Sequence, residues 1–303
     1  MARSDPAFRA DVLAGLAAPI PAVPARWLYD RRGSELFEEI TRLPEYYPTR
    51  TEAALLERYS GEIAAMLGKG EAVVEFGSGS STKTPILLRA VHPAAYVPID
   101  ISGDFLRESA DALRAEFPGL PIHPVEADFM RRLDLPDAIA AAPKLGFFPG
   151  STIGNLVPRT AVDLLRAMKE TLGDGSRLVI GMDRTKDVGV LLAAYDDAAG
   201  VTAAFNLNLL ERINRELGGN IPIHAFRHRA LWNDRLARIE KVAESTVKAM
   251  SRSASRCISI RLIASFQIAR WRKASIGMSA PSSALMRWSR LRLNAAVTPV
   301  ASS

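Results

Sequence analysis

A short apolar run that leads into a glycine turn constrains the fold of this chain more than any other stretch. Residues 73–76 (Val-Val-Glu-Phe) have the composition of a buried parallel strand. Gly77 and Gly79 follow, and because neither carries a Cβ, the backbone can turn tightly and approach a ligand closely. Residues 83–90 then predict a helix whose first N–H groups face the space beyond the strand. This order is typical of a nucleotide-type site at the end of a first strand, although a Gly-x-Gly pair also occurs in ordinary strand–helix turns.

Four further apolar runs repeat the same order of a strand followed by polar residues. They cover residues 94–99, 120–125, 145–148 and 177–182, and helical patterns separate them. Because the carboxyl ends of parallel strands meet at one edge of a sheet, the polar residues after these runs are expected to lie together. Five such units predict an α/β fold, a doubly wound sheet with its site along one edge.

Acidic residues at the strand ends narrow the choice of ligand. The turn lacks the spacing of a P-loop, and Thr82 stands where a dinucleotide-binding turn needs its third glycine. Glu75, Asp100 and Asp128 accompany three successive strands, and Asp100 follows the turn at about the 20-residue spacing at which an acid reaches a ribose hydroxyl. S-adenosylmethionine suits this set, because it offers a sulfonium, an ammonium and a ribose diol and has no phosphate. Each acid alone could also be a solvated loop residue or a helix cap.

Composition argues against several other classes of protein. Cys257 is the one cysteine, so a disulfide within the chain and a thiolate metal cluster are both excluded. Among the four histidines only His224 and His228 are close together, and without acids at ligand spacing we expect surface histidines and no metal site. The sequence has no apolar stretch near the roughly 18 residues of a membrane span, and Asp5 and Asp11 interrupt the place of a signal peptide. We expect a cytoplasmic monomer without a membrane partner.

The basic residues of the chain are concentrated in its tail. Residues 245–303 contain ten Lys and Arg and no Asp or Glu, whereas the whole chain has a net charge of +6. The first 244 residues therefore carry a net charge of −4. A mildly acidic body argues against nucleic acid as a partner.

Two segments outside the predicted sheet are candidates for the substrate side of the site. Ser34 is predicted to cap a helix, and residues 41–50 then form a proline-bracketed loop with Tyr46 and Tyr47 before a helix at 51–67. Either tyrosine could pack between helices or face the site. After the fifth strand, residues 191–200 and 201–217 predict helices and residues 221–232 have strand character. An insertion at this point of a doubly wound fold lies over the carboxyl edge of the sheet, where a substrate lid would sit.

Three motifs resemble one family closely. Residues 147–156 (Phe-Phe-Pro-Gly-Ser-Thr-Ile-Gly-Asn-Leu), 42–50 (Arg-Leu-Pro-Glu-Tyr-Tyr-Pro-Thr-Arg) and 194–206 are similar to segments of the histidine-specific S-adenosylmethionine-dependent methyltransferases, the L-histidine Nα-methyltransferases of ergothioneine biosynthesis. The resemblance covers roughly residues 7–240. It implies a Rossmann-like class I methyltransferase sheet with an added substrate-binding subdomain. It also implies S-adenosyl-L-methionine as methyl donor and three methylations of the α-amine of L-histidine, which give hercynine.

The resemblance also implies roles for individual residues. The cofactor site would be lined by Gly77, Lys83, Asp100, Asp128 and Phe129. Tyr46, Asn155 and Tyr195 would hold the amino acid, and Tyr29 or Tyr46, directly or through water, is the candidate for a catalytic proton acceptor. These residue types suit a zwitterion, because Asn both donates and accepts hydrogen bonds and a tyrosine hydroxyl can hold an amine or a carboxylate. The domains expected are an N-terminal helical segment at 1–60, a cofactor-binding core at 61–186, a substrate lid at 187–242 and an atypical basic tail at 243–303.

The tail departs from the family pattern. The family continues with a Glu-x-Ser segment that reads the imidazole and with strands that complete the sheet, whereas residues 245–303 have 13 serines and no acid. One hypothesis is a translated frameshift that begins near Lys241, and recoding the DNA in the other two frames tests it. The alternative is a basic arm for nucleic acid or an acidic partner. On the first hypothesis the sheet keeps an open edge and the activity of this chain is in doubt. A paralogue that methylates another amino acid and a non-catalytic S-adenosylmethionine-binding chain remain alternatives.

Overall fold

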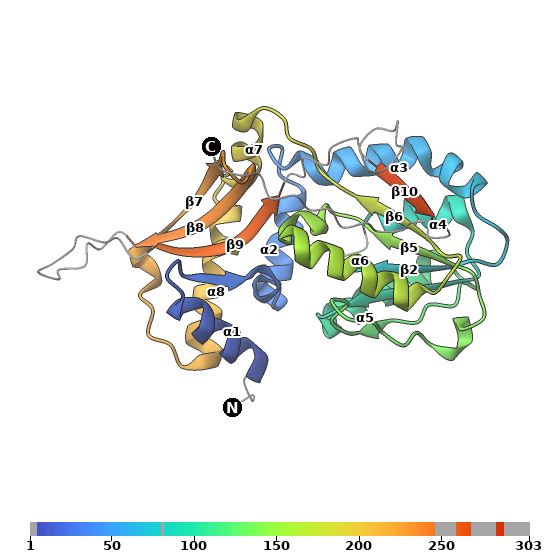
Figure 1. Ribbon diagram of the computed structural model, residues 1–303, viewed down its shortest axis with the longest axis horizontal. Helices are drawn as coiled ribbons and strands as arrows, with labels where there is room; N and C mark the ends of the chain where they lie inside the picture. Colours follow the sequence, from blue (N-terminus) through green and yellow to red (C-terminus); the bar gives the residue numbers. More distant parts are fainter. Residues whose placement is uncertain (1–4, 80–81, 246–258, 268–282, 288–303) are drawn as a thin grey trace, which may run out of the picture.

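The larger of two sheets has six strands in the order β10-β6-β5-β2-β3-β4. This computed structural model describes residues 5–79, 82–245, 259–267 and 283–287 (Figure 1). The five strands from the predicted core run parallel, and β10 pairs antiparallel with β6 at the edge. Their bounds are β2 Ala72–Phe76, β3 Ala95–Asp100, β4 Val125–Glu126, β5 Lys144–Phe148, β6 Arg177–Gly181 and β10 Ser283–Arg287.

Helices cover both faces of this sheet, because alternate residues of each buried strand point to opposite sides. Val73 contributes to a core with α3, α4 and α5, whereas its neighbour Val74 contributes to a core with α6. Figure 1 shows the two layers on either side of the strands. The helices of this unit are α3 Tyr47–Ala65, α4 Thr84–Val91, α5 Gly103–Glu116 and α6 Pro158–Leu172, with the short turns η2 Asp137–Ile139 and η3 Thr152–Asn155. The doubly wound α/β prediction, of Rossmann-like class I type, is confirmed.

The strand order reverses beside β2. The chain passes from β2 to β3 and β4 on one side and then returns to β5 on the other side of β2. A crevice forms where two neighbouring strands lead to helices on opposite faces, and open α/β sheets bind their ligands in such a crevice. The glycine turn after β2 and the loop after β5 therefore face the same space.

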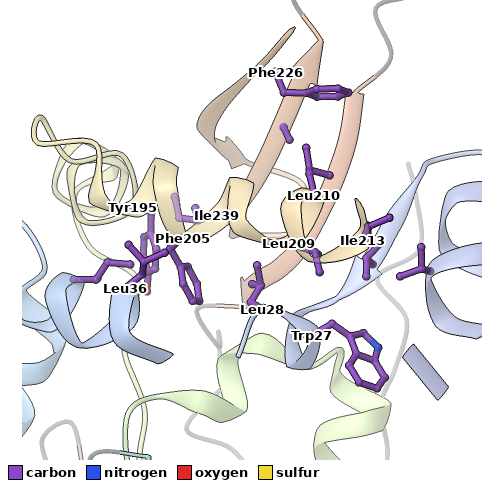
Figure 2. Close-up of a cluster of buried hydrophobic side chains, with 14 of the residues drawn as sticks. Trp27, Leu28, Leu36, Tyr195, Phe205, Leu209, Leu210, Ile213, Phe226 and Ile239 are labelled. Carbon is purple, nitrogen blue, oxygen red and sulfur yellow. The ribbon is translucent and has the colours of Figure 1, made fainter. Parts of the chain in front are cut away.

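The second sheet combines the two ends of the chain, in the order β1-β9-β8-β7. β1 pairs parallel with β9, while β7, β8 and β9 form an antiparallel set. A buried apolar cluster joins this sheet to α8 and to the N-terminal helices, and Figure 2 shows Phe205 of α8 near Leu36 and Tyr195 within it. The elements are α1 Pro6–Ala17, β1 Ala22–Pro24, η1 Ala25–Leu28, α2 Arg31–Thr41, α7 Val188–Tyr195, α8 Val201–Leu217, η4 Ile223–Ala225, β7 Phe226–Asn233, β8 Arg238–Ser245 and β9 Ser259–Gln267.

Several local predictions are wrong. The expected open edge is covered, since β10 pairs with β6 along five residues from Ser283 to Arg287. Asp30 caps α2 by accepting a hydrogen bond from Gly33 N–H at 2.8 Å, so Ser34 lies inside the helix. The strand expected at 120–125 is reduced to β4, because Pro121 and Pro124 have no N–H to donate to a ladder.

The prediction of surface histidines also fails at one position. His228 lies on β7 with a relative exposure of 9% and His224 lies in η4, so the two do not share a helix face. The division of the chain into residues 1–60, 61–186, 187–242 and 243–303 stays a prediction, although the second sheet draws strands from the first and last of these ranges. Among the described residues, no helix combines the length and the apolar character that crossing a membrane requires.

Candidate functional site

A cavity of about 690 Å³ opens at the carboxyl edge of the larger sheet, between that sheet and the second one. It lies where the strand order reverses, as the fold predicts. Eight of the residues predicted for the site line it together: Tyr29, Tyr46, Gly77, Lys83, Asp100, Asp128, Phe129 and Asn155. The remaining one, Tyr195, is buried directly behind Tyr46. Their individual roles remain predictions.

The glycine turn and Asp100 form one end of the cavity. Gly77 and Gly79 have φ values of +71° and +48°, in the region that favours glycine. A Cβ on Gly77 would also lie 3.4 Å from the ring of Phe129. Asp100 accepts hydrogen bonds from the backbone N–H of Gly79 at 3.1 Å and of Ser102 at 2.9 Å, one on each oxygen. Each oxygen keeps a lone pair, so the carboxylate is fixed at the turn and can still accept from a ribose hydroxyl.

Phe129 and Asp128 form the neighbouring wall. The Phe129 ring packs edge-on against Phe76 and Phe148, with ring centroids 6.2 and 5.8 Å apart. Asp128 accepts from Met130 N–H at 3.0 Å. Arg26 reaches the other Asp128 oxygen at 3.4 Å across the cavity mouth. A flat aromatic face next to a carboxylate suits a planar base with an exocyclic amine.

Glu75 lines the same cavity as Asp100 and Asp128 but is more deeply buried than either. Its side chain is 1% exposed and accepts hydrogen bonds from the hydroxyls of Tyr96 at 2.6 Å and Thr84 at 2.7 Å. Burial raises the pKa of Glu75 to about 7, against the opposing effect of these two hydrogen bonds. The carboxyl therefore joins the start of α4 to β3 beneath the glycine turn, and its known partners are protein hydroxyls.

Aromatic side chains form the other end of the cavity. Tyr46 meets Tyr195 edge to face with ring centroids 5.9 Å apart, and Tyr29 packs on Phe37 and Phe205 at 5.5 Å each. Burial raises the pKa of Tyr29, Tyr46 and Tyr195 above 10, and nearby acids such as Asp100 and Glu52 add to the shift. A phenol whose pKa is raised stays protonated at neutral pH, so these hydroxyls can donate hydrogen bonds but supply little phenolate. The role of Tyr29 or Tyr46 as proton acceptor, directly or through water, stays a prediction.

Asn155 lies between the two ends. It closes the short turn η3, which follows two residues in the left-handed region, Gly150 at φ +81° and Ser151 at φ +55°. The Asn155 Oδ1 atom is buried and has no hydrogen-bond partner among the described residues. Because a buried acceptor without a partner is costly, this oxygen points to a donor on a ligand, such as an amine.

Two residues that support the walls of the cavity could not be predicted from the motifs. His228 accepts from the Asn206 amide at Nδ1, 2.9 Å away, and donates from Nε2 to the carbonyl of Tyr195 at 2.8 Å. Glu52 on α3 accepts from the N–H of Gly150 and forms an ion pair with Lys83. Neither His228 nor Glu52 lies in one of the three motifs. Each is recognised only by its contact with a residue that is distant in the sequence. Within the described ranges, His, Cys, Asp and Glu side chains form no cluster that could hold a metal ion.

Comparison with known proteins agrees with this geometry. The sequence profile of the family described as histidine-specific, S-adenosylmethionine-dependent methyltransferases matches residues 8–275. The match continues beyond Glu240, where the resemblance was expected to stop. The chain is 47% identical over 238 residues to the histidine N-alpha-methyltransferase of Mycolicibacterium smegmatis, covering 77% of this chain and 73% of that protein.

More distant relatives have related names. The corresponding protein of Mycobacterium tuberculosis is 43% identical over 77% of this chain and 73% of its own length. Ergothioneine biosynthesis protein 1 of Neurospora crassa is 32% identical over 65% of this chain and 23% of its own length. Among solved structures, a S-adenosylmethionine-bound amino pentose methyltransferase from Micromonospora echinaspora has a TM-score of 0.37 and 15% identity, covering 77% of this chain and 83% of that one.

Proposed function

Because the chain belongs to the family of histidine-specific, S-adenosylmethionine-dependent methyltransferases, we propose that it methylates the α-amine of L-histidine three times to form hercynine. The name of the relative from Mycolicibacterium smegmatis specifies the α-nitrogen. Ergothioneine biosynthesis, named for the relative from Neurospora crassa, is the pathway we propose for the product.

One observation carries the proposal. The residues expected to bind the cofactor and, apart from Tyr195, those expected to bind the amino acid line a single cavity, the first set at one end and the second at the other. Gly77, Asp100 and Phe129 supply a turn, an acid and an aromatic wall at one end. Tyr46 and Asn155 supply hydroxyl and amide groups at the other end. A methyl donor and an amine held there would share one enclosed space.

The residues present fit S-adenosylmethionine. Asp100 would accept from the ribose hydroxyls, Phe129 would pack on the adenine, and the Lys83 ammonium would face the methionyl carboxylate. When bound, S-adenosylmethionine supplies an electrophilic methyl group on a sulfonium. No covalent bond to the protein is needed, so positioning of the amine is the main contribution of the site.

The substrate end would orient the amine. Asn155 Oδ1 would accept from the amine N–H, and the protonated hydroxyl of Tyr46 would donate to the carboxylate, which leaves the amine lone pair free for the methyl group. Tyr195 would support Tyr46 from behind. Each round begins with loss of one proton from the substrate ammonium to solvent. The neutral amine then forms one N–C bond, while one S–C bond breaks with its electron pair left on sulfur. The ammonium forms that enter all three rounds carry at least one N–H that can donate to Asn155, whereas the final quaternary ammonium has none. Loss of that hydrogen bond favours release of the fully methylated product.

Calorimetric titration tests the proposal. S-adenosylhomocysteine is titrated into the full chain first and L-histidine into that complex second, and mass spectrometry then counts methyl groups in a turnover assay. We expect both ligands to bind, a trimethylated product, and loss of histidine binding in Asn155→Ala with unchanged S-adenosylhomocysteine affinity.

Other outcomes separate the alternatives. Methylation of another amino acid in preference to histidine would identify a paralogue of different specificity. Binding of S-adenosylhomocysteine without turnover of any amino acid would favour a non-catalytic binding protein. The frameshift hypothesis predicts this last result, because residues 245–303 have no acid to pair with an imidazole. Most of these residues lie outside the described ones, so recoding of the DNA remains the direct test.

The setting of the reaction is also part of the proposal. We propose a monomer that acts in the cytoplasm on free L-histidine and has no membrane or nucleic-acid partner. Size-exclusion chromatography with light scattering, with and without S-adenosylhomocysteine, tests the monomer.

A further inference from the structure

Glu52 touches groups at the ends of three strands. Its two carboxylate oxygens accept from the backbone N–H of Gly150 at 3.0 and 2.8 Å, at the end of β5. It forms an ion pair with Lys83, which precedes α4 in the turn after β2. A Cβ on Gly181, the last residue of β6, would lie only 1.7 Å from a Glu52 oxygen. The carboxylate therefore occupies the space that the missing side chain of Gly181 leaves.

Each partner of Glu52 leads to a different half of the cavity. Lys83 is a candidate for the cofactor end, while Gly150 begins the turn that ends at Asn155, a candidate for the substrate end. Gly150 and Ser151 both have positive φ values. Because a non-glycine residue such as Ser151 is strained there, the surrounding contacts must hold this turn in place.

The ion pair is largely shielded from water. The side chains of Glu52 and Lys83 are 17% and 14% exposed. Removal of one partner from a buried pair leaves an uncompensated charge, so each partner constrains the position of the other. Because the Lys83 ammonium has three N–H donors, it can hold a ligand carboxylate and Glu52 together. The ligand would thereby fix Lys83 and, through Glu52, act on the N–H of Gly150.

We propose that Glu52 is a positioning residue that couples the cofactor end of the site to the Asn155 turn. A ligand carboxylate at Lys83 stabilises the Lys83–Glu52–Gly150 arrangement, which in turn orders the turn that presents Asn155. The inference rests on the proposed function, because it takes Lys83 and Asn155 as groups that contact the two ligands. It predicts that cofactor and histidine strengthen each other's binding, since such coupling is reciprocal.

The test compares Glu52→Gln with Glu57→Gln, an exposed glutamate on the same helix. The amide oxygen of Gln can still accept from Gly150 N–H, but the ion pair with Lys83 is lost. We expect S-adenosylhomocysteine to improve histidine affinity at least tenfold in the unaltered chain and in Glu57→Gln, and less than twofold in Glu52→Gln. A similar improvement in all three proteins, or less than twofold in the unaltered chain, would overturn the inference.

A second measurement does not depend on histidine. Hydrogen exchange of a peptide covering residues 148–157 is followed with and without S-adenosylhomocysteine. We expect the ligand to slow exchange in the unaltered chain and in Glu57→Gln but not in Glu52→Gln. If histidine fails to bind while this difference persists, the proposed function fails and the coupling stands. Equal protection in Glu52→Gln overturns the coupling.

Gly181→Ala disturbs the contacts of Glu52 without removing the charge of Glu52 or of Lys83. The added Cβ would displace the Glu52 carboxylate, which is the end of a flexible side chain, and would lie 3.3 Å from the Gly150 backbone nitrogen, a tight contact that a shift of a few tenths of an ångström relieves. The fold should therefore tolerate the change. We expect the loss of protection seen for Glu52→Gln with a thermal midpoint close to that of the unaltered chain. Full protection in Gly181→Ala would contradict the role of Glu52.

Discussion

The ring of Tyr195, at the end of α7, stands at 88° to the ring of Tyr46, whose residue precedes α3. The contact joins the insertion after β6 to the loop before α3, and it closes the substrate end of the cavity. Tyr46 lines the cavity itself, while Tyr195 is 4% exposed. The two phenols are therefore parts of one wall.

Tyr195→Phe tests the hydroxyl of this wall. The ring contact with Tyr46 is preserved, so we expect little change in the thermal midpoint. The Tyr195 hydroxyl is hydrogen-bonded to that of Tyr46, so its removal acts on the ligand through Tyr46, and loss of one such bond, about 0.5–1.5 kcal/mol, corresponds to a fall of roughly 2- to 13-fold in kcat/KM for histidine. Steady-state kinetics, with Tyr59→Phe on α3 as control, provide the measurement. A kcat/KM equal to that of the unaltered chain would exclude a role for the hydroxyl in orienting Tyr46.

His228 offers a test of how Tyr195 is held. Because the Asn206 amide nitrogen can only donate, Nδ1 of His228 is the acceptor and Nε2 carries the hydrogen that Tyr195 accepts. Gln at this position places a donor near the Nε2 position, whereas Asn does not reach it. We expect His228→Asn to raise the KM for histidine about tenfold, from a lost hydrogen bond of about 1 kcal/mol or more, and His228→Gln to raise it much less. Equal KM values for the two variants would argue against this role.

Glu75 makes stability depend on pH. Its pKa is raised by burial from an ordinary 4.5 to about 7, so between these pH values the folded chain binds more protons than the unfolded chain. The stability from this group is complete below pH 4.5 and is lost as pH rises through 7, by an amount on the order of 3 kcal/mol. In Glu75→Gln this contribution is absent. Urea unfolding at several pH values measures the difference, and parallel pH profiles for the two proteins would contradict the prediction.

Lys241 is a buried cation, and it changes the pH dependence of stability in the direction opposite to Glu75. It lies on β8 with a relative exposure of 5%, its ammonium is 5.0 Å from the Phe205 ring centroid, and burial lowers its pKa to about 8. The unfolded chain therefore binds more protons between pH 8 and 10.5, and stability rises with pH in this range. Lys241→Met keeps an apolar stem on Phe205 and removes the charge, so we expect stabilisation of about 3 kcal/mol at pH 7 that shrinks towards pH 10.

The control for Lys241→Met is Lys69→Met, at an exposed position. Chemical unfolding of both variants at pH 7 and pH 10 is the measurement. Stabilisation of the same size at both pH values would show that the gain comes from packing and has no contribution from the buried charge.

The elements that the sequence predicts best are those determined by residues adjacent in the chain. The strands at Ala72–Phe76 and Lys144–Phe148 and the helix Val201–Leu217 lie within two residues of their expected bounds, because their apolar patterns are strong and local. The cavity-lining positions of Gly77 and Asp100 follow from the same patterns, since each directly follows or ends a strand.

What the sequence could not predict depends on distant contacts. Glu52 is one of several glutamates in its segment, and only folding brings it to Gly150 and Lys83. The β1–β9 pair is parallel and joins residues 22–24 to residues 261–263. No strand pattern was recognised in the sequence of residues 245–303, so the second sheet was not predicted. For the same reason the pairing of β10 with β6 was missed.

The pairing of β1 with β9 has a consequence for synthesis on the ribosome. Residues 22–24 emerge early, but their partner strand emerges only after residue 263, when the whole parallel core has already been translated. Since domains generally fold as units during translation, the half of the cavity built by the glycine turn and Asp100 can form on the nascent chain before the second sheet is complete. The β1 edge of the cavity, at Val23 and Pro24, is fixed by pairing only after β9 has emerged.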